Sequence, residues 1–362
     1  MFSGKRIRQA REVNRLTQDE LARLIRKSQA AITHVEREFK EPSAELVSAI
    51  AQHTHFPVSF FANEPRAEFP LKALLFRSRS SARRRDAIAV ARYAEIIFEM
   101  TMDLAAYVTT IPLRLERSAK SPVEAARESR RWLGLTSGVP VPHLINSMER
   151  AGIVVMAIPH PRSDIDAFSA WIDSVPIIAL CAESKAGDRR RWSAAHELGH
   201  LVLHLGKAIR SDEHKQADEF AAELLLPEVA MRKEVRPPVT LTSLALMKPQ
   251  WGVSIQALVY RSHELGIITD RQYRYLFEQL SIRGWRTNEP SNLDVPVEKP
   301  RALRKMVELV PFGADTTRLA AELRLDEEKL HEILSLYEDR SGPQGPTDER
   351  VVSSKVIRMR KG

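Results

Sequence analysis

One stretch decides how the middle of the chain folds: Arg191-Trp192-Ser193-Ala194-Ala195-His196-Glu197-Leu198-Gly199-His200-Leu201-Val202-Leu203-His204. Apolar residues recur in it three and four positions apart, which predicts a helix with one buried face. These residues are Ala195, Leu198, Leu201 and Val202. The same helix carries the pattern H-E-x-x-H, which has chemical meaning in a helical context.

The two histidines of this pattern predict a zinc site. His196 and His200 are four residues apart, so a helix places them on one side with Cβ atoms roughly 5–6 Å apart. Two neutral imidazoles at that separation can bind one Zn²⁺ at about 2.0–2.1 Å. Glu197 is expected to be the general base that takes a proton from a zinc-bound water. His204, one turn further along, is expected to pack or to support a ligand rather than to bind metal.

A small sheet is expected before this helix. Three short apolar or alternating segments predict strands, after a helix at residues 143–151. They are residues 153–158, 166–172 and 176–180. One edge of such a sheet can bind an extended peptide by strand addition. After the metal helix, Ser211 is expected to cap a further helix that runs to Leu226.

These elements together resemble a known family. The runs Ala195-His196-Glu197-Leu198-Gly199-His200 and Gln216-Ala217-Asp218-Glu219-Phe220-Ala221-Ala222-Glu223-Leu224-Leu225-Leu226-Pro227 resemble the ImmA/IrrE family of bacterial metallopeptidases. The resemblance covers about residues 140–230 and implies a zincin-like domain with one Zn²⁺ per chain. It also implies a zinc-dependent endopeptidase whose substrate is a repressor or other regulatory protein.

The third zinc ligand has two candidates. In this family it is usually a Glu four residues before the Asp or Asn of the second motif, and counting back from Asp218 reaches His214. The alternative is a shift of one residue to Glu213. Three histidines and a water are an accepted zinc site, so we expect His214 to be the ligand. Asp218 would then orient a ligand imidazole.

The first 52 residues predict a helix-turn-helix. Thr17 can cap a helix that begins at Gln18, with Glu20 completing a capping box, and Ser28 can cap the next helix. The second of two helices joined in this way can enter a major groove. Residues 1–41 hold ten Lys or Arg and six Asp or Glu, so their net charge is 10 − 6 = +4. This excess favours binding to phosphates.

This segment resembles the XRE (phage-repressor-like) DNA-binding domain. The resemblance rests on Leu16-Thr17-Gln18-Asp19-Glu20-Leu21-Ala22, Ser28-Gln29-Ala30-Ala31-Ile32-Thr33-His34-Val35-Glu36-Arg37 and Pro42-Ser43. It implies five helices, a structural pair between Arg11 and Glu36, and a homodimer on a double-stranded operator. The residues that it implies for DNA binding are Gln18 on the phosphate backbone, Gln29, Thr33 and His34 toward the bases, and Ser28. The family usually has Gly where this chain has Glu38, so that turn is expected to differ.

The expected fold is mostly helical with a small α+β domain. We expect the helix-turn-helix over residues 1–64, a helical linker region over 65–139 with a basic run at Arg77–Arg85, and the peptidase domain over 140–230. A helical, helix-turn-helix-like C-terminal region follows over 231–340, and residues 341–362 are expected to be disordered.

The composition fits a cytoplasmic protein. The chain has 362 residues, 43% hydrophobic and 28% charged, with one cysteine and a formal net charge of +8. A single cysteine excludes an internal disulfide, no apolar run is long enough to cross a membrane, and the first residues lack the apolar core of a signal peptide.

Three hypotheses about function follow from the sequence. The first is a DNA-bound regulator that carries an active zinc endopeptidase with Glu197 as general base. The second is a transcription factor whose zinc domain senses a ligand or metal without proteolysis. The first is favoured because a structural zinc does not need Glu197 and usually has a fourth protein ligand. The third, a protease that only docks on DNA, predicts affinity without sequence preference.

Overall fold

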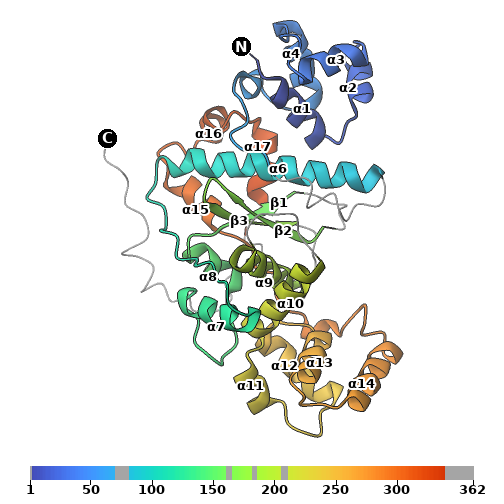
Figure 1. Cartoon of the computed structure of the whole chain (residues 1–362). Helices are drawn as coiled ribbons and strands as arrows, with labels where there is room; N and C mark the ends of the chain where they lie inside the picture. Colours follow the sequence, from blue (N-terminus) through green and yellow to red (C-terminus); the bar gives the residue numbers. More distant parts are fainter. Residues whose placement is uncertain (1, 70–80, 160–164, 182–185, 205–210, 339–362) are drawn as a thin grey trace.

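The computed structural model describes residues 2–69, 81–159, 165–181, 186–204 and 211–338 (Figure 1). Within these ranges the chain is mostly helical and holds one three-stranded sheet, which confirms the predicted fold class. Part of the basic run, residues 77–80, and the tail from 341 to 362 lie outside them. No helix within the described ranges is both long and apolar enough to cross a bilayer.

The N-terminal helices form as their capping residues predict. They are α1 (Gly4–Val13), α2 (Gln18–Leu24), α3 (Gln29–Glu36), α4 (Ala44–Thr54) and the 3-10 helix η1 (Val58–Ala62). The capping box of Thr17 and Glu20 is present, and the Ser28 hydroxyl accepts from the backbone N–H of Ala31 at 3.2 Å. The predicted helix-turn-helix is therefore confirmed, with a 3-10 helix as its fifth element.

A long helix, α6 (Ser81–Ala105), lies between the helix-turn-helix and the sheet (Figure 1). Its contact with α1 is polar and buried. Glu12 of α1 accepts from Arg92 Nε at 2.7 Å, and Gln9 donates to Glu95 at 2.8 Å. All four side chains are at most 8% exposed. Because a buried charge is costly unless it is paired, this network fixes how the two elements meet.

The sheet has the strand order β1-β3-β2. β1 (Val154–Ile158) runs parallel to β3 (Val175–Cys181), and β2 (Ala167–Ile172) runs antiparallel to it. Side chains alternate between two cores. Phe168 and Ala170 face the core shared with α6, whereas Ala167 and Trp171 face the core under the helix with the H-E-x-x-H pattern. β2 is therefore an edge strand with one face toward that helix.

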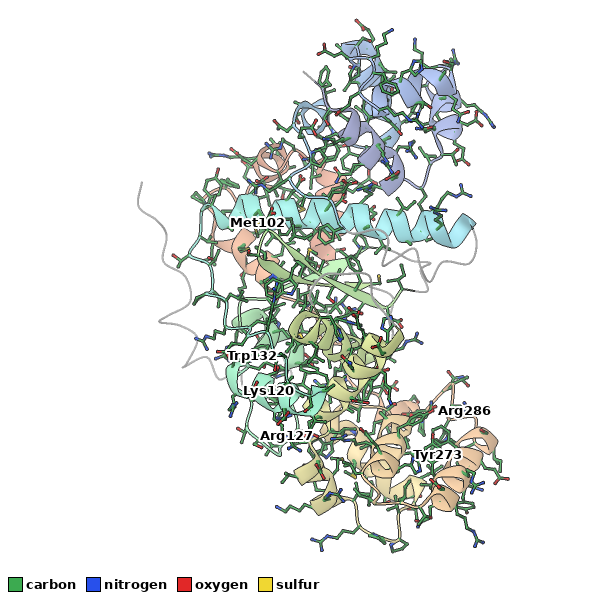
Figure 2. The ribbon with its side chains drawn as sticks, in the orientation of Figure 1. Met102, Lys120, Arg127, Trp132, Tyr273 and Arg286 are labelled. Atoms are coloured by element: carbon green, nitrogen blue, oxygen red, sulfur yellow. The ribbon has the colours of Figure 1, made fainter. Side chains whose placement is uncertain are left out.

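Helices cover the second face of the sheet. They are α7 (Pro122–Trp132), α8 (Leu144–Arg150), α9 (Gly187–Leu203) and α10 (Ser211–Leu225), followed by α11 (Glu228–Glu234). α9 packs on β2 and β3, and α10 packs on both α9 and α7. Arg127 of α7, labelled in Figure 2, donates to the buried carboxylate of Glu223 in α10 at 2.8 Å.

The C-terminal helices divide into two groups. α12 (Leu241–Trp251), α13 (Ile255–Glu264) and α14 (Asp270–Ile282) lie beyond α10 at the lower end of Figure 1. Lys248 of α12 is 3% exposed and bonds both Asp188 of α9 and Glu289 at 2.7 Å. This buried charge triad holds α12 against the start of the metal helix.

The chain then returns to the sheet. After η2 (Ser291–Leu293), the helices α15 (Ala302–Leu309), α16 (Thr316–Glu322) and α17 (Glu327–Ser335) follow. α15 packs against α6 and β1. The Tyr337 hydroxyl accepts from the backbone N–H of Ala157 in β1 at 3.0 Å. Lys329 of α17 donates to Tyr93 of α6 at 3.0 Å. The last described helices therefore pack against α6, the long helix that also contacts the helix-turn-helix.

Candidate metal centre and DNA-binding surface

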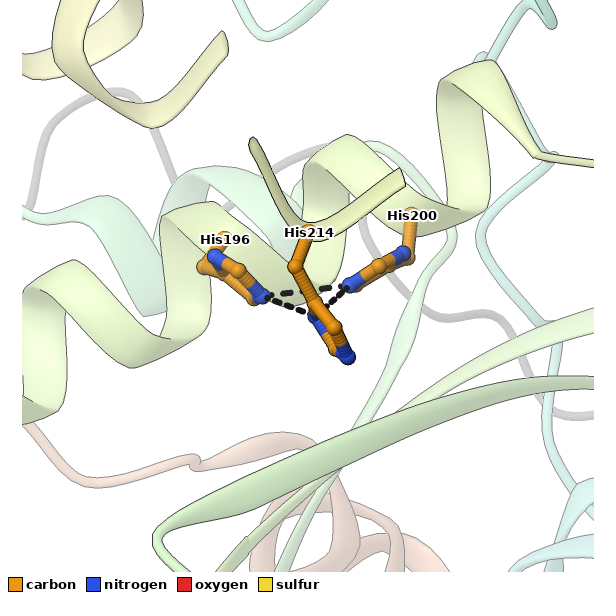
Figure 3. A group of neighbouring side chains, drawn as sticks. All are labelled: His196, His200 and His214. Carbon is orange, nitrogen blue, oxygen red and sulfur yellow. Dashed lines mark hydrogen bonds between the residues drawn. The ribbon is translucent and has the colours of Figure 1, made fainter. Parts of the chain in front are cut away.

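Three histidines converge between α9 and α10. His196 and His200 come from α9 and His214 from α10, and Figure 3 shows their rings pointing toward a common centre. The Nε2 atoms of His196 and His200 are 3.1 Å apart, and His214 Nδ1 lies 3.3 Å and 3.2 Å from them. Among the described residues, these three form a group of side chains able to hold a metal ion.

The triangle of nitrogens fits a tetrahedral metal. Ligand atoms placed about 2.0–2.1 Å from a tetrahedral zinc lie about 3.3 Å from one another. The observed separations of 3.1–3.3 Å are close to this value. Three ring nitrogens this close cannot all hydrogen-bond one another with neutral imidazoles, since each neutral ring carries a single N–H. The donor set therefore suits a shared cation with one coordination position left for a water.

The remaining ring nitrogens of two histidines have partners. His196 Nδ1 lies 2.7 Å from Asp218 Oδ1, a contact through which a carboxylate can orient an imidazole. His200 Nδ1 lies 2.9 Å from His204 Nδ1, and His204 Nε2 lies 3.0 Å from Gln216 Oε1. His204 therefore lies behind His200 and outside the triangle. Each contact fixes the orientation of a ring that faces the centre.

A glycine allows the two helices to approach closely. A Cβ atom added at Gly199 would lie 3.2 Å from the Cα atom of Ala217 and 3.1 Å from the ring of Phe220. Both neighbours belong to α10, and Phe220 is fully buried. The missing side chain therefore lets α10 pack against α9, and the packing brings His214 to the two histidines of α9. Glu213, the alternative ligand, is half-buried and is not part of the cluster.

Glu197 lies beside the cluster on the sheet side of α9. Its Oε2 accepts a hydrogen bond from Ser169 Oγ of β2 at 2.7 Å. One turn further along the helix, the backbone carbonyl of Leu201 accepts from Trp171 Nε1 at 3.2 Å. The sequence motif predicts Glu197 but not Ser169, because a strand residue 28 positions earlier shares no local pattern with it.

The residues predicted to bind DNA lie at the start of α2 and along α3. Ser28, Gln29 and His34 are exposed, whereas Gln18 and Thr33 are half-buried. Gln18 and Thr33 bond one another, since the Thr33 hydroxyl donates to Gln18 Oε1 at 3.0 Å. Ser28 caps α3. The structure thus gathers the five residues on two adjacent helices.

A buried ion pair lies behind this surface. Arg11 donates to both carboxylate oxygens of Glu36 at 2.5 Å and 2.9 Å, as the resemblance implied. Gln18 Nε2 donates to the same carboxylate at 2.8 Å. The pair therefore ties α1 to the end of α3 and to the first residue of α2.

The turn after α3 keeps a backbone that glycine favours. Glu38 has φ of 58°, in the left-handed region. Its N–H donates to the carbonyl of Val35 at 3.0 Å, and the N–H of Phe39 donates to that of His34 at 2.9 Å. These two bonds are the Schellman arrangement that ends many helices. The glutamate is thus accommodated in a standard helix end.

Sequence reasoning did not predict how α6 meets the helix-turn-helix. Arg85, from the basic run, lies at the start of α6 with its Nη1 atom 3.5 Å from Glu20 Oε1 of α2. Arg15 pairs with Asp86 at the same place. The described part of the basic run is therefore helical and adjoins the helix-turn-helix. The only sequence signal was the charge itself, which says nothing about its partner.

Two parts of the chain match known family models. Residues 7–61 match the family model described as "Helix-turn-helix". Residues 148–263 match the peptidase-family model described as "IrrE N-terminal-like domain". No curated protein matches the chain. The second match spans β1 to α13 and so includes the three histidines and Glu197.

Proposed function

Because the chain joins a DNA-binding helix-turn-helix to an IrrE N-terminal-like domain, we propose that it is a transcriptional regulator carrying a zinc-dependent endopeptidase. In this proposal the endopeptidase hydrolyses a peptide bond in a repressor or other regulatory protein. The observation that carries it is the triangle of His196, His200 and His214, with the acid Glu197 directly after His196 in the same helix.

The proposed metal ligands are the three histidines, with one Zn²⁺ per chain. His214 is preferred to Glu213 because its Nδ1 completes the triangle at 3.2–3.3 Å. Asp218 and His204 would hold the rings of His196 and His200 in the binding orientation. Bound zinc supplies a Lewis acid and an acidified water at neutral pH.

The acid and base chemistry is assigned to Glu197. Its carboxylate takes the proton that the attacking water loses, and returns a proton to the amine that leaves when the C–N bond breaks. The substrate is proposed to lie as an extended strand along β2. This strand is at the edge of the sheet, and its Ala167, Ser169 and Trp171 lie on the side of α9.

DNA binding is proposed to use the surface described above. Gln29 is exposed at the first turn of α3 and is suited to bidentate contact with adenine. Gln18 and Ser28 would contact the phosphate backbone, and Thr33 and His34 the bases. We propose that the protein binds an inverted repeat as a homodimer, with half-sites roughly 10 bp apart, the spacing at which dimeric helix-turn-helix proteins bind.

The test of the peptidase uses a substrate that need not be known beforehand. Zinc-loaded wild type and Glu197→Gln are incubated with whole-cell extract, and new peptide N-termini are identified by mass spectrometry. We expect new N-termini with wild type and a decrease of roughly 10²–10⁴-fold with Glu197→Gln. Zinc content should be equal in both, because Glu197 is not a ligand. If both proteins give the same N-termini as untreated extract, the peptidase proposal fails.

A further inference from the structure

Two hydrogen bonds join β2 to α9, and the spacing of their donors along the strand matches the spacing of their acceptors along the helix. Ser169 bonds Glu197 and Trp171 bonds the carbonyl of Leu201. Two residues along a strand advance about 6.6 Å, and four residues along a helix advance about 6.0 Å. Because these advances are nearly equal, both side chains of the strand can reach successive turns of the helix.

Trp171 fixes the register of this contact. Besides its bond to Leu201, its ring lies under the guanidinium of Arg117, whose Cζ is 4.2 Å from the ring centroid. Its neighbour on the other face of the strand, Ala170, is packed in the core shared with α6. A slip of the strand by one residue would exchange these two faces. The strand is therefore held where Ser169 meets Glu197.

From this geometry we infer that Ser169 is a positioning residue for the general base, an inference that rests on the proposed function. The serine hydroxyl donates to Oε2 at 2.7 Å and so holds the carboxylate in one orientation. The other carboxylate oxygen then faces the reacting atoms and takes the proton. Without this bond the carboxylate loses one contact that restrains it and samples more orientations, of which only a fraction can accept the proton.

The role differs from that of a substrate-binding residue. Ser169 is half-buried, and its hydroxyl proton is committed to Glu197. A residue that acts through the base changes kcat, whereas a residue that binds substrate equally in ground state and transition state changes KM. The kinetic constants therefore distinguish the two roles.

The decisive experiment compares Ser169→Ala, Ser169→Thr and Glu197→Gln in the full-length, zinc-loaded protein. The probe is a quenched fluorescent peptide with the sequence around the most abundant new N-terminus from the extract experiment. We expect Ser169→Ala to lower kcat by about 10–100-fold, the usual effect of losing such a support, with KM within about twofold. Ser169→Thr keeps a hydroxyl and suits a strand, so it should restore most of the rate.

Two measurements do not depend on turnover. Zinc affinity, measured by competition with a chelator, should be the same in wild type and Ser169→Ala. A crystal structure of zinc-loaded Ser169→Ala should show the Glu197 carboxylate in more than one orientation. Ser129→Ala is the matched control, because it removes a buried serine hydroxyl that bonds only its own helix, at Ala125 O and 2.8 Å. Its kcat should equal that of wild type.

Each contrary result has a separate meaning. A rise in KM with unchanged kcat would make Ser169 a substrate-binding residue, and a loss of zinc affinity would make it a structural one. Failure of Ser169→Thr to restore the rate would show that the hydroxyl is not what matters. If Glu197→Gln lowers the rate and Ser169→Ala does not, this inference alone fails. If wild type cleaves nothing, the proposed function fails and the inference falls with it.

Discussion

Two pairs of helices carry the functional side chains, and they hold them in opposite ways. In α2 and α3 the residues predicted to bind DNA are exposed or half-buried, and the pair of Arg11 and Glu36 is buried behind them. In α9 and α10 the three histidines point toward one another, and two of the rings have a hydrogen-bond partner on the side away from the triangle. The helices α2 and α3 present a surface to solvent, whereas α9 and α10 enclose the centre of the histidine triangle.

The two arrangements differ because a metal ion and a DNA duplex place different geometric demands on the side chains that bind them. A metal accepts ligand distances within about 0.2 Å of its preferred values, so each imidazole needs its own hydrogen-bond partner. Several side chains contact a DNA duplex across a wide groove. The position of the helix backbone therefore affects DNA binding more than the rotamer of any one side chain. The helix-turn-helix therefore has its buried charges between helices, whereas the proposed metal centre has its polar contacts on the proposed ligands themselves.

The largest expected effect tests the buried support of the helix-turn-helix. Glu36→Ala removes the carboxylate that accepts two bonds from Arg11 and leaves that guanidinium buried. Breaking such a pair costs about 3–5 kcal/mol. Amide hydrogen exchange in the full-length protein should show α1 to α3 opening with a free energy lower by this amount.

Arg8→Ala provides the control for this prediction. Arg8 also bonds a carboxylate, Glu12, at 2.8 Å, but its side chain is 48% exposed. Because Arg8 is half-exposed and Glu12 keeps its bond from Arg92, the loss of Arg8 should cost about 1 kcal/mol or less. Equal effects of Glu36→Ala and Arg8→Ala would mean that the buried pair is not the support of this surface.

The next effect tests the metal centre and its third ligand. His214→Ala removes one of three proposed zinc ligands, and each ligand of a zinc site contributes on the order of 3 kcal/mol. Zinc affinity should therefore fall by about a hundredfold or more, as measured by chelator competition. Glu213→Ala is the matched control on the neighbouring residue and should bind zinc as wild type does. The reverse result would move the ligand to Glu213.

Local patterns were enough to predict much of both regions. The H-E-x-x-H helix, the capping box at Thr17 and the three strands all depend on residues within a few positions of one another, and the structure has each of them. Ser169 could not be predicted, because its role depends on how β2 packs on α9. The contact of Gln9 with Glu95 was also unpredictable, since 86 positions separate the two residues.

The third effect concerns the recognition surface itself. Gln29→Ala removes a side chain that is exposed and has no structural bond to lose, although its backbone carbonyl accepts from Thr33. It should weaken binding to the operator by about 1–3 kcal/mol and relax the preference at one base. The operator is first selected from random duplexes at physiological salt, and affinities are then compared by fluorescence anisotropy. Equal wild-type affinity for random and selected duplexes would favour simple docking over regulation.

The smallest effect concerns the turn that ends the recognition helix. Glu38 holds φ of 58°, which costs a residue other than glycine about 1–2 kcal/mol. Glu38→Gly removes that strain but adds about 0.5–1 kcal/mol of chain entropy lost on folding. The net gain in stability is expected to be about 0.5–1 kcal/mol, visible as slower amide exchange in α3.

Glu38→Gly also removes a negative charge at the exposed end of α3, so affinity for any duplex should rise slightly. Glu38→Gln separates the two effects, because it removes the charge and keeps the side chain that the left-handed backbone disfavours. It should raise DNA affinity as Glu38→Gly does, without the gain in stability. If Glu38→Gln stabilises α3 as much as Glu38→Gly, the cost at this turn is electrostatic and the backbone argument is wrong. The recognition helix would then resemble the metal centre in depending on the charges around it rather than on its backbone.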